Sequence, residues 1–125
     1  MPEIYRFLAH HIFDYYNNQL VAASPKLKKA LDTAIQKAKS NPTTAGEWMR
    51  RVPSELQGKI YKMWVSGRGG HRLFYLFFSE NKLVIGVFIS PEIRSRFNYE
   101  DFPWELFLEV ALDFKAEKLE NFRII

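Results

Sequence analysis

Residues 59–90 read KIYKMWVS-GRGG-HRLFYLFF-SEN-KLVIGVFIS, and this stretch decides the expected fold. Its three runs, residues 59–66, 71–78 and 82–90, are rich in β-branched and aromatic side chains. The two spacers between them are short and turn-prone, and spacers of that kind join antiparallel neighbours. The stretch therefore predicts a three-stranded antiparallel meander.

The residues before the meander predict one strand and two helices. Residues 4–8 predict a short first strand, and residues 11–22 predict a helix with apolar side chains at helical spacing. Ser24-Pro25 is a helix-start signal, a hydroxyl cap followed by proline at the first helical position. The apolar stripe of this second helix consists of Leu27, Ala30, Leu31, Ala34, Ile35 and Ala38, and Asn41-Pro42 ends it.

Two further segments complete the expected secondary structure. Residues 43–57 predict a loop with one helical turn, in which Trp48, Met49 and Val52 fold back on the core. After the meander, Asp101 caps a last helix that is entered through Pro103. The buried stripe of that helix is Phe107, Val110, Ala111 and Phe114.

This order of elements predicts an α+β fold. The expected architecture is a four-stranded, mostly antiparallel sheet with two N-terminal helices on one face and a C-terminal helix, which leaves the opposite face free for a site. The 125 residues suit a single domain over residues 1–125.

The composition excludes several classes of protein. The chain has no cysteine, so disulfides, thiolate nucleophiles and cysteine zinc sites are excluded. A signal peptide and an apolar run of membrane-spanning length are both missing from the sequence, so the expected compartment is the cytoplasm.

The charge is unevenly distributed. Residues 26–96 contain 14 Lys and Arg against five acids, which gives +9, whereas residues 98–125 contain three against seven, which gives −4. A basic middle segment favours a polyanionic partner, either nucleic acid or an acidic protein segment. Alternatively, the lysines at 26, 28, 29, 37 and 39 form no more than a solvated helix face.

Strand alternation predicts a cluster of cations at one end of the meander. Arg72 shares a face with Phe74, Leu76 and Phe78, and Lys62 lies between Ile60 and Trp64. In an antiparallel meander the start of the middle strand lies near the end of the third, so Arg72 is expected near Arg94 and Arg96, with Tyr99 beyond. A guanidinium is costly to bury unpaired at such a position, so Arg72 is expected in solvent, in a surface ion pair or on a ligand. The convergence of several cations favours a phosphate as that ligand.

Such a site suits RNA cleavage without a metal, in which the 2′-hydroxyl attacks the neighbouring phosphate. Arg72 and Arg94 are the candidates that stabilise the developing negative charge, and Lys62 is the candidate base. Tyr99 is expected to stack on a nucleobase or to donate a proton. No metal or other cofactor is expected, because His10, His11 and His71 lack metal-ligand spacing.

Three further residues are predicted to contact RNA: Arg68, His71 and Arg96. Arg68 lies in the hairpin Gly67-Arg68-Gly69-Gly70, which opens no helix and so is no phosphate-binding fingerprint. His71 is also a candidate acid or base. Glu92 is a second candidate base, although it equally suits an ion pair with Arg94.

The meander and the basic residues that follow it resemble the RelE/ParE toxin superfamily. The resemblance covers about residues 57–99 and rests on the run 59–65, on His71-Arg72-Leu73-Phe74-Tyr75, and on Arg94, Arg96 and Tyr99. The strand–helix–helix prelude agrees in layout. Within the superfamily, the opening Phe7–Phe13 segment is most similar to the YhaV branch.

The resemblance implies a type II toxin that cleaves messenger RNA, often on the ribosome, and that a cognate antitoxin neutralises. Lys62, Arg72, Arg94 and Tyr99 match the functional positions. The sequence departs from the pattern at His71, where tyrosine is usual, and at Trp64, a position that is basic in RelE itself. The second departure leaves the identity of the base open.

The sequence leaves two alternatives to a nuclease. The first is a ParE-like protein that blocks DNA gyrase without cutting RNA, and the second is an inactive homologue that retains only antitoxin binding. The ParE branch tends to lack the basic catalytic set, so Arg72, Arg94 and Tyr99 together favour cleavage.

Overall fold

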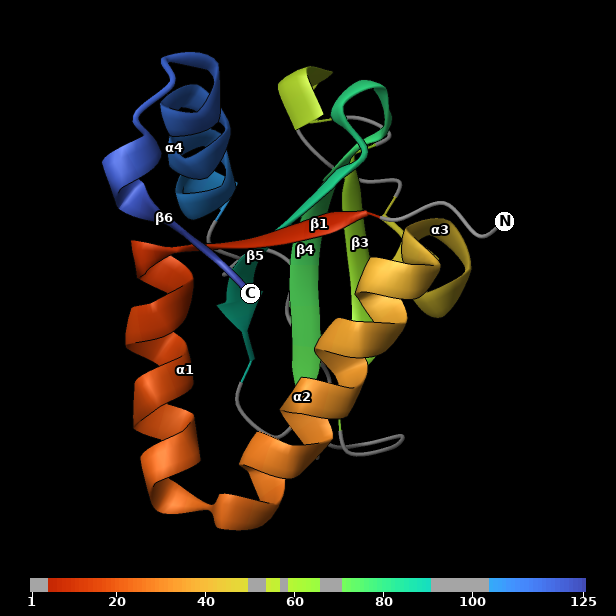
Figure 1. Cartoon of the computed structure of the whole chain (residues 1–125), viewed down its shortest axis with the longest axis vertical. Helices are drawn as coiled ribbons and strands as arrows, with labels where there is room; N and C mark the ends of the chain where they lie inside the picture. Colours follow the sequence, from red (N-terminus) through yellow and green to blue (C-terminus); the bar gives the residue numbers. More distant parts are fainter. Residues whose placement is uncertain (1–4, 50–53, 57–58, 66–70, 91–103) are drawn as a thin grey trace.

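A computed structural model describes residues 5–49, 54–56, 59–65, 71–90 and 104–125 of the chain (Figure 1). The helices and turns in these residues are α1 (His11–Ala23), α2 (Pro25–Ser40), α3 (Pro42–Ala45), η1 (Ser54–Leu56), η2 (Ser79–Asn81), α4 (Trp104–Lys115) and η4 (Leu119–Asn121). The strands are β1 (Arg6–His10), β2 (Glu47–Trp48), β3 (Ile60–Trp64), β4 (Arg72–Phe78), β5 (Leu83–Ile89) and β6 (Phe122–Ile124). The α+β class and the order of the predicted elements are confirmed.

The strands form one mixed sheet in the order β2-β3-β4-β5-β1-β6. The predicted meander is confirmed, because β3, β4 and β5 pair antiparallel in sequence. The expected count of four strands is wrong for the described residues, since the short strands β2 and β6 extend the two edges. The sheet is mixed because β1 pairs parallel with β5. The helices α1 and α2 carry the chain from β1 across the sheet to β2 and β3 at its other side.

One face of the sheet is covered by α1 and α2, as predicted. Figure 1 shows these helices as a V-shaped pair, with α2 passing in front of β3 and β4. The Ser24 hydroxyl accepts the Leu27 N–H at 3.3 Å and caps α2. The buried stripe of α2 packs on side chains such as Phe7 and Tyr75. Gly86 is required here, because a Cβ would lie 2.9 Å from the Phe7 ring.

The opposite face is not free, which corrects the expectation from the sequence. Phe107, Val110 and Ala111 of α4 are buried against side chains of this face, including Phe74. The cause is visible in β4, whose sequence after Arg72 is apolar at every position and therefore needs cover on both sides. The expected site must therefore lie at an end of the sheet rather than on its open face.

The expectation that residues of the 43–57 segment fold back on the core is confirmed only in part. Met49 is buried, as expected, but Trp48 is 49% exposed, so it does not fold back on the core. Val52, Asp101 and Pro103 lie outside the described residues. None of the helices in the described ranges has the length and apolar character that a membrane span requires.

Candidate functional site

Lys62 and Arg72 line the same pocket, at the end of the sheet where β3 finishes and β4 begins. Arg72 pairs across the strands with Trp64, and Lys62 pairs with Phe74, so alternation places all four on one face, as predicted. The pocket has a volume of about 360 Å³. Its walls are Thr44, Ala45, Gly46, Glu47, Lys62, Met63, Trp64 and Arg72. We call it the β3–β4 pocket.

The Arg72 guanidinium rests on an aromatic ring rather than on a carboxylate. Its Cζ lies 4.1 Å from the centre of the Trp64 ring, which is cation–π geometry. Among the described residues, no Asp or Glu forms an ion pair with Arg72. The ring therefore orients the guanidinium and leaves its N–H donors available to an anion.

Ser90 fastens the end of β5 to the start of β4. The Ser90 side chain is fully buried, and its hydroxyl accepts the Arg72 N–H at 3.0 Å. The Ser90 N–H in turn donates to the Arg72 carbonyl at 2.9 Å. The expected proximity of the two strand ends is confirmed, so the chain leaves β5 beside Arg72.

His71 is held at the same junction. Its Nδ1 lies 2.8 Å from the Ser90 carbonyl oxygen, and because a carbonyl only accepts, Nδ1 must be the donor. Nε2 is then the nitrogen available for other partners. His71 does not line the β3–β4 pocket, so it remains a predicted RNA contact at its border.

The other predicted site residues lie outside the described residues. These are Arg68, Glu92, Arg94, Arg96 and Tyr99. Their roles stay predictions. Of the predicted catalytic set, the structure therefore brings together Lys62 and Arg72.

The wall opposite Arg72 is built by the turn around α3. The buried Tyr75 hydroxyl donates to the Pro42 carbonyl and fixes this turn on the sheet. A Cβ on Gly46 would collide with that hydroxyl, so glycine is required for the close approach. Burial, with a smaller contribution from Tyr61, raises the pKa of Tyr75 far above its ordinary value, so Tyr75 acts as a structural donor.

Several residues of the β3–β4 pocket are not among the predicted site residues, including Trp64, Thr44 and Glu47. Trp64 could have been found, because alternation places it on the same face as Lys62 in the same strand. Thr44 and Glu47 could not, because they reach the pocket only through the pairing of β2 with β3. A two-residue strand has no periodicity that a sequence would reveal.

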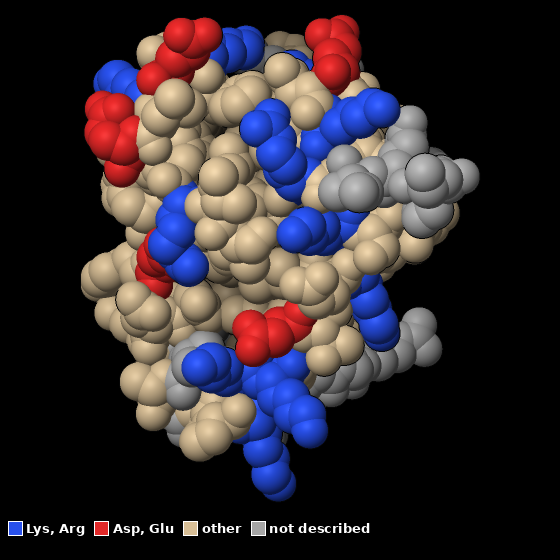
Figure 2. All heavy atoms as spheres, in the orientation of Figure 1, with Lys and Arg blue, Asp and Glu red and all other residues tan. Residues whose placement is uncertain are grey.

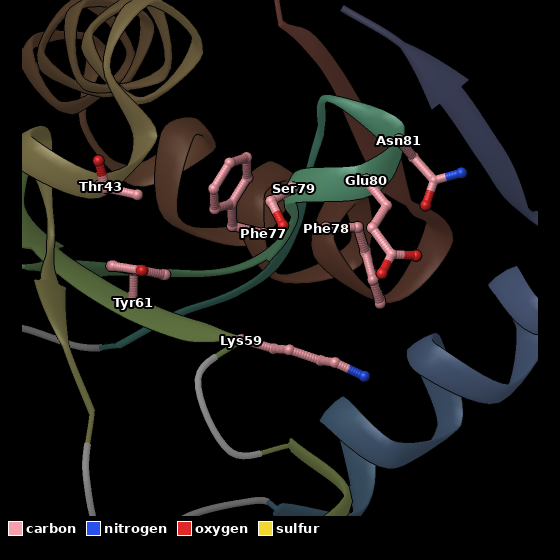
Figure 3. A pocket seen from close by; sticks show the side chains of 8 residues that line it. All are labelled: Thr43, Lys59, Tyr61, Phe77, Phe78, Ser79, Glu80 and Asn81. Carbon is pink, nitrogen blue, oxygen red and sulfur yellow. The ribbon is translucent and has the colours of Figure 1, made fainter.

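A second pocket, of about 440 Å³, lies at the other end of β3 (Figure 3). Its aromatic wall contains Tyr61 and Phe77, and Thr43 lies across from them. Its charged residues are one base, Lys59, and one acid, Glu80. The charges of this lining cancel, so it is a weaker candidate for a polyanion than the β3–β4 pocket.

His10 of β1 and Asp113 of α4 form a buried polar pair that joins these two elements, away from the β3–β4 pocket. His10 Nδ1 accepts the Ile12 N–H at 3.1 Å, so its Nε2–H donates to the Asp113 carboxylate at 2.8 Å. This hydrogen bond is the main cause that holds the pKa of Asp113 below its ordinary value, against the opposing effect of burial. The Asn121 amide and the Lys118 ammonium add to the lowering.

The sequence does not indicate the His10–Asp113 pair, since it raises His10 only as a possible metal ligand. Within the described ranges, no group of three or more His, Asp or Glu side chains could hold a metal ion. His10 is fully buried, and both of its ring nitrogens have partners inside the protein. The pair is therefore structural.

No protein-family model matches this sequence, and no curated protein gives a significant match.

Proposed function

We propose that this chain is the toxin of a type II toxin–antitoxin pair, a metal-independent endoribonuclease of the RelE type that acts on messenger RNA. The observation that supports the proposal most strongly is the β3–β4 pocket, where Arg72 lies on the Trp64 ring and Lys62 lines the same wall. The mixed sheet with its meander and N-terminal helix pair is compatible with this family.

The charge of the pocket suits a phosphodiester. Its charged lining residues are Lys62, Arg72 and Glu47, so the two cations exceed the acid. A guanidinium stays protonated at any physiological pH and can hold two phosphate oxygens at once. Because Trp64 already orients that guanidinium, little reorganisation is needed when the phosphate arrives.

The proposed reaction is an internal transfer at phosphorus. The 2′-hydroxyl gives its proton to a base, and its oxygen bonds to the adjacent phosphorus. The bond from phosphorus to the 5′-oxygen then breaks, and that oxygen takes a proton. The products are a 2′,3′-cyclic phosphate and a 5′-hydroxyl end, with no oxidation or reduction.

The proposed roles of Arg72 and Lys62 follow from their positions in the pocket. Arg72 stabilises the negative charge that develops on the phosphoryl oxygens, and Lys62 receives the 2′-hydroxyl proton when it is in its neutral amine form. Arg94 and Tyr99 lie outside the described residues, so their roles are proposed from the resemblance alone. Arg94 is the proposed second source of positive charge and Tyr99 the proposed stacking or proton-donating residue.

The test is inducible expression with mapping of transcript ends. The wild type should arrest growth and cut messenger RNA, whereas the Arg72→Ala, Arg94→Ala double variant should do neither. Arrest with intact messenger RNA and impaired DNA supercoiling would contradict the nuclease and support the ParE-like alternative. Neither arrest nor cleavage by the wild type would leave the antitoxin-binding homologue as the explanation.

Two controls on the purified protein make the test specific. Lys62→Ala should abolish cleavage, whereas Lys59→Ala should not, because Lys59 belongs to the same strand region but lines the second pocket. An RNA with one 2′-deoxynucleotide at the mapped cut site should resist cleavage at that bond. Cleavage of that bond in the deoxy substrate would exclude the 2′-hydroxyl as nucleophile.

A further inference from the structure

A further hollow lies beside the β3–β4 pocket, at α3 and the second half of α2. That hollow has a volume of about 410 Å³ and shares Thr44 and Ala45 with the β3–β4 pocket. Its other lining residues are Thr33, Gln36, Lys37, Ser40 and Asn41, all at or after the middle of α2. We call this hollow the α2 groove. The two hollows share only two lining residues, Thr44 and Ala45, and both have small side chains.

The α2 groove lies on one flank of a lysine-rich helix. The sequence of α2 contains five lysines and one acid, Asp32. Helical spacing places Lys29 on the side of the groove with Thr33 and Lys37, and Lys26 about one turn before Lys29 on the same side. The same spacing places Lys28, Asp32 and Lys39 on the opposite flank. Figure 2 shows that Lys and Arg side chains predominate along the α2 side of the molecule.

The two flanks differ in what surrounds their lysines. On the far flank, Lys39 donates to the Ile125 carbonyl at 3.3 Å, and Lys28 lies one turn from the acid Asp32 without forming a described ion pair with it. On the groove flank, Lys37 is exposed and forms no ion pair with any described acid. The groove therefore has one cation at its far end, opposite the cations of the β3–β4 pocket.

The lining of the groove suits a nucleotide. Gln36 and Asn41 present amides, which can both donate to and accept from a base edge. The Thr33 and Ser40 hydroxyls donate to the backbone of their own helix, so each keeps lone pairs for an incoming donor. Both hollows fall in the size range of about 300–1,000 Å³ that small-ligand sites occupy.

We infer that the α2 groove holds the neighbouring nucleotides of the single-stranded RNA whose scissile phosphate lies at Arg72, with Lys37 contacting a phosphate. This inference rests on the proposed function, and it adds to the point of cleavage the path that the neighbouring nucleotides follow across the protein. A single strand is required, because its unstacked bases can be turned toward the amides. The alternative from the sequence, that these lysines form no more than a solvated helix face, then applies to Lys28 and Lys39 on the opposite flank.

The experiment measures binding of 2′-O-methyl RNA, which cannot be cut, to the wild type and to Lys37→Ala and Lys28→Ala. The ligands are a uridine dinucleotide and a longer mixed-sequence single strand. Lys37→Ala should weaken binding of the long strand only, and should reduce its slope of log affinity against log salt by about 0.7, the value for one lost phosphate contact. Lys28→Ala should behave as the wild type.

The outcomes separate this inference from the proposed function. Equal effects of Lys37→Ala and Lys28→Ala, or no effect of either, in a wild type that cleaves RNA would overturn the groove but not the nuclease. A wild type that binds long RNA through Lys37 but never cleaves would overturn the nuclease and keep the groove. A wild type that binds no RNA would overturn both. Thermal unfolding of each variant checks that the exposed lysines have been changed without loss of the fold.

Discussion

Two regions of the sheet differ in what contacts their arginine side chain, a carboxylate in one and an aromatic ring in the other. At the β1–β6 edge, which we call the paired edge, Arg123 holds Asp14 through two hydrogen bonds of 2.7 and 3.2 Å, and His10 holds Asp113. At the β3–β4 pocket, Arg72 lies on the ring of Trp64 and pairs with no described carboxylate. Both regions have an arginine on a strand, but among the described residues Arg123 pairs with a carboxylate and Arg72 does not.

The difference separates structure from function. A cation that is matched inside the protein contributes to stability and has little attraction left for a ligand. A cation that is oriented by an aromatic ring has its geometry fixed while its charge remains available. Substitutions at the paired edge should therefore change stability, and those at the β3–β4 pocket should change activity.

The largest effect should come from placing a carboxylate directly against the Arg72 guanidinium, which pairs with no described acid. Trp64 lies directly across from Arg72, so Trp64→Glu places a carboxylate beside the guanidinium. We expect RNA cleavage to slow by about 100-fold or more relative to Trp64→Gln, the loss typical when one electrostatic stabiliser is removed. The measurement is the single-turnover cleavage rate of a labelled RNA.

Trp64→Gln is the matched control, because it removes the same ring without adding charge. Both variants should unfold at similar temperatures. Equal cleavage rates for the two would show that the ring, and not the free charge of Arg72, is what the site requires.

The next effect concerns stability at the paired edge. His10→Ala removes the donor to Asp113 and the acceptor that caps the Ile12 N–H, and it leaves a buried carboxylate with poorer partners. Breaking a buried charged hydrogen-bonded pair costs about 3 kcal/mol of unfolding free energy. Urea unfolding of the purified protein measures this loss.

His11→Ala is the control for His10→Ala, since the two rings lie 4.2 Å apart but His11 is exposed. It should lose far less stability. Both variants should cleave RNA at the wild-type rate per folded molecule. A cleavage defect in His10→Ala that exceeds its unfolded fraction would mean that the paired edge also serves the reaction.

Local patterns in the sequence predict the parts of the fold that depend on local physics. The period of α2, its Ser24 cap and the alternation of the meander each involve residues within one element, and all are confirmed. Alternation also places Arg72 on the face of Phe74 and Lys62 on the face of Trp64, and the observed register of β3 and β4 brings these two faces together. Apart from that register, these features follow from spacing alone.

The features that the sequence does not reveal depend on how distant elements meet. His10 and Asp113 are 103 residues apart, and neither position has a local pattern that indicates the other. Glu47 enters the β3–β4 pocket through a two-residue strand, too short to show alternation. The cover provided by α4 could have been inferred, because the apolar β4 sequence needs a layer on each face.

A smaller effect should appear when the pH falls. The folded protein holds the pKa of Asp113 below its ordinary value of about 3.9, so near and below that value the unfolded chain binds a proton that the folded chain does not. The stability contributed by Asp113 is therefore complete at neutral pH and is lost as the pH falls through the folded pKa. Urea unfolding from neutral to acidic pH measures the decline.

Asp113→Asn isolates this contribution, because its amide oxygen still accepts from His10 but does not titrate. The wild type should be more stable than Asp113→Asn at pH 7, and the gap should close as the pH falls below about 4. A gap that stays constant with pH would show that the ionised form of Asp113 is not what stabilises the pair.

The smallest effect is expected at Arg123. Its side chain is 58% exposed, although its bidentate contact with Asp14 raises the pKa of the guanidinium. Exposed ion pairs contribute at most about 1 kcal/mol, and salt screens them, so Arg123→Ala should lower the unfolding free energy by less than that and by less still at high salt. Cleavage should not change, because the charge of Arg123 is already matched by Asp14. If Arg123→Ala instead weakened RNA cleavage as strongly as Arg72→Ala, internal pairing would not distinguish the structural from the functional arginine, and the contrast between the two regions would not hold.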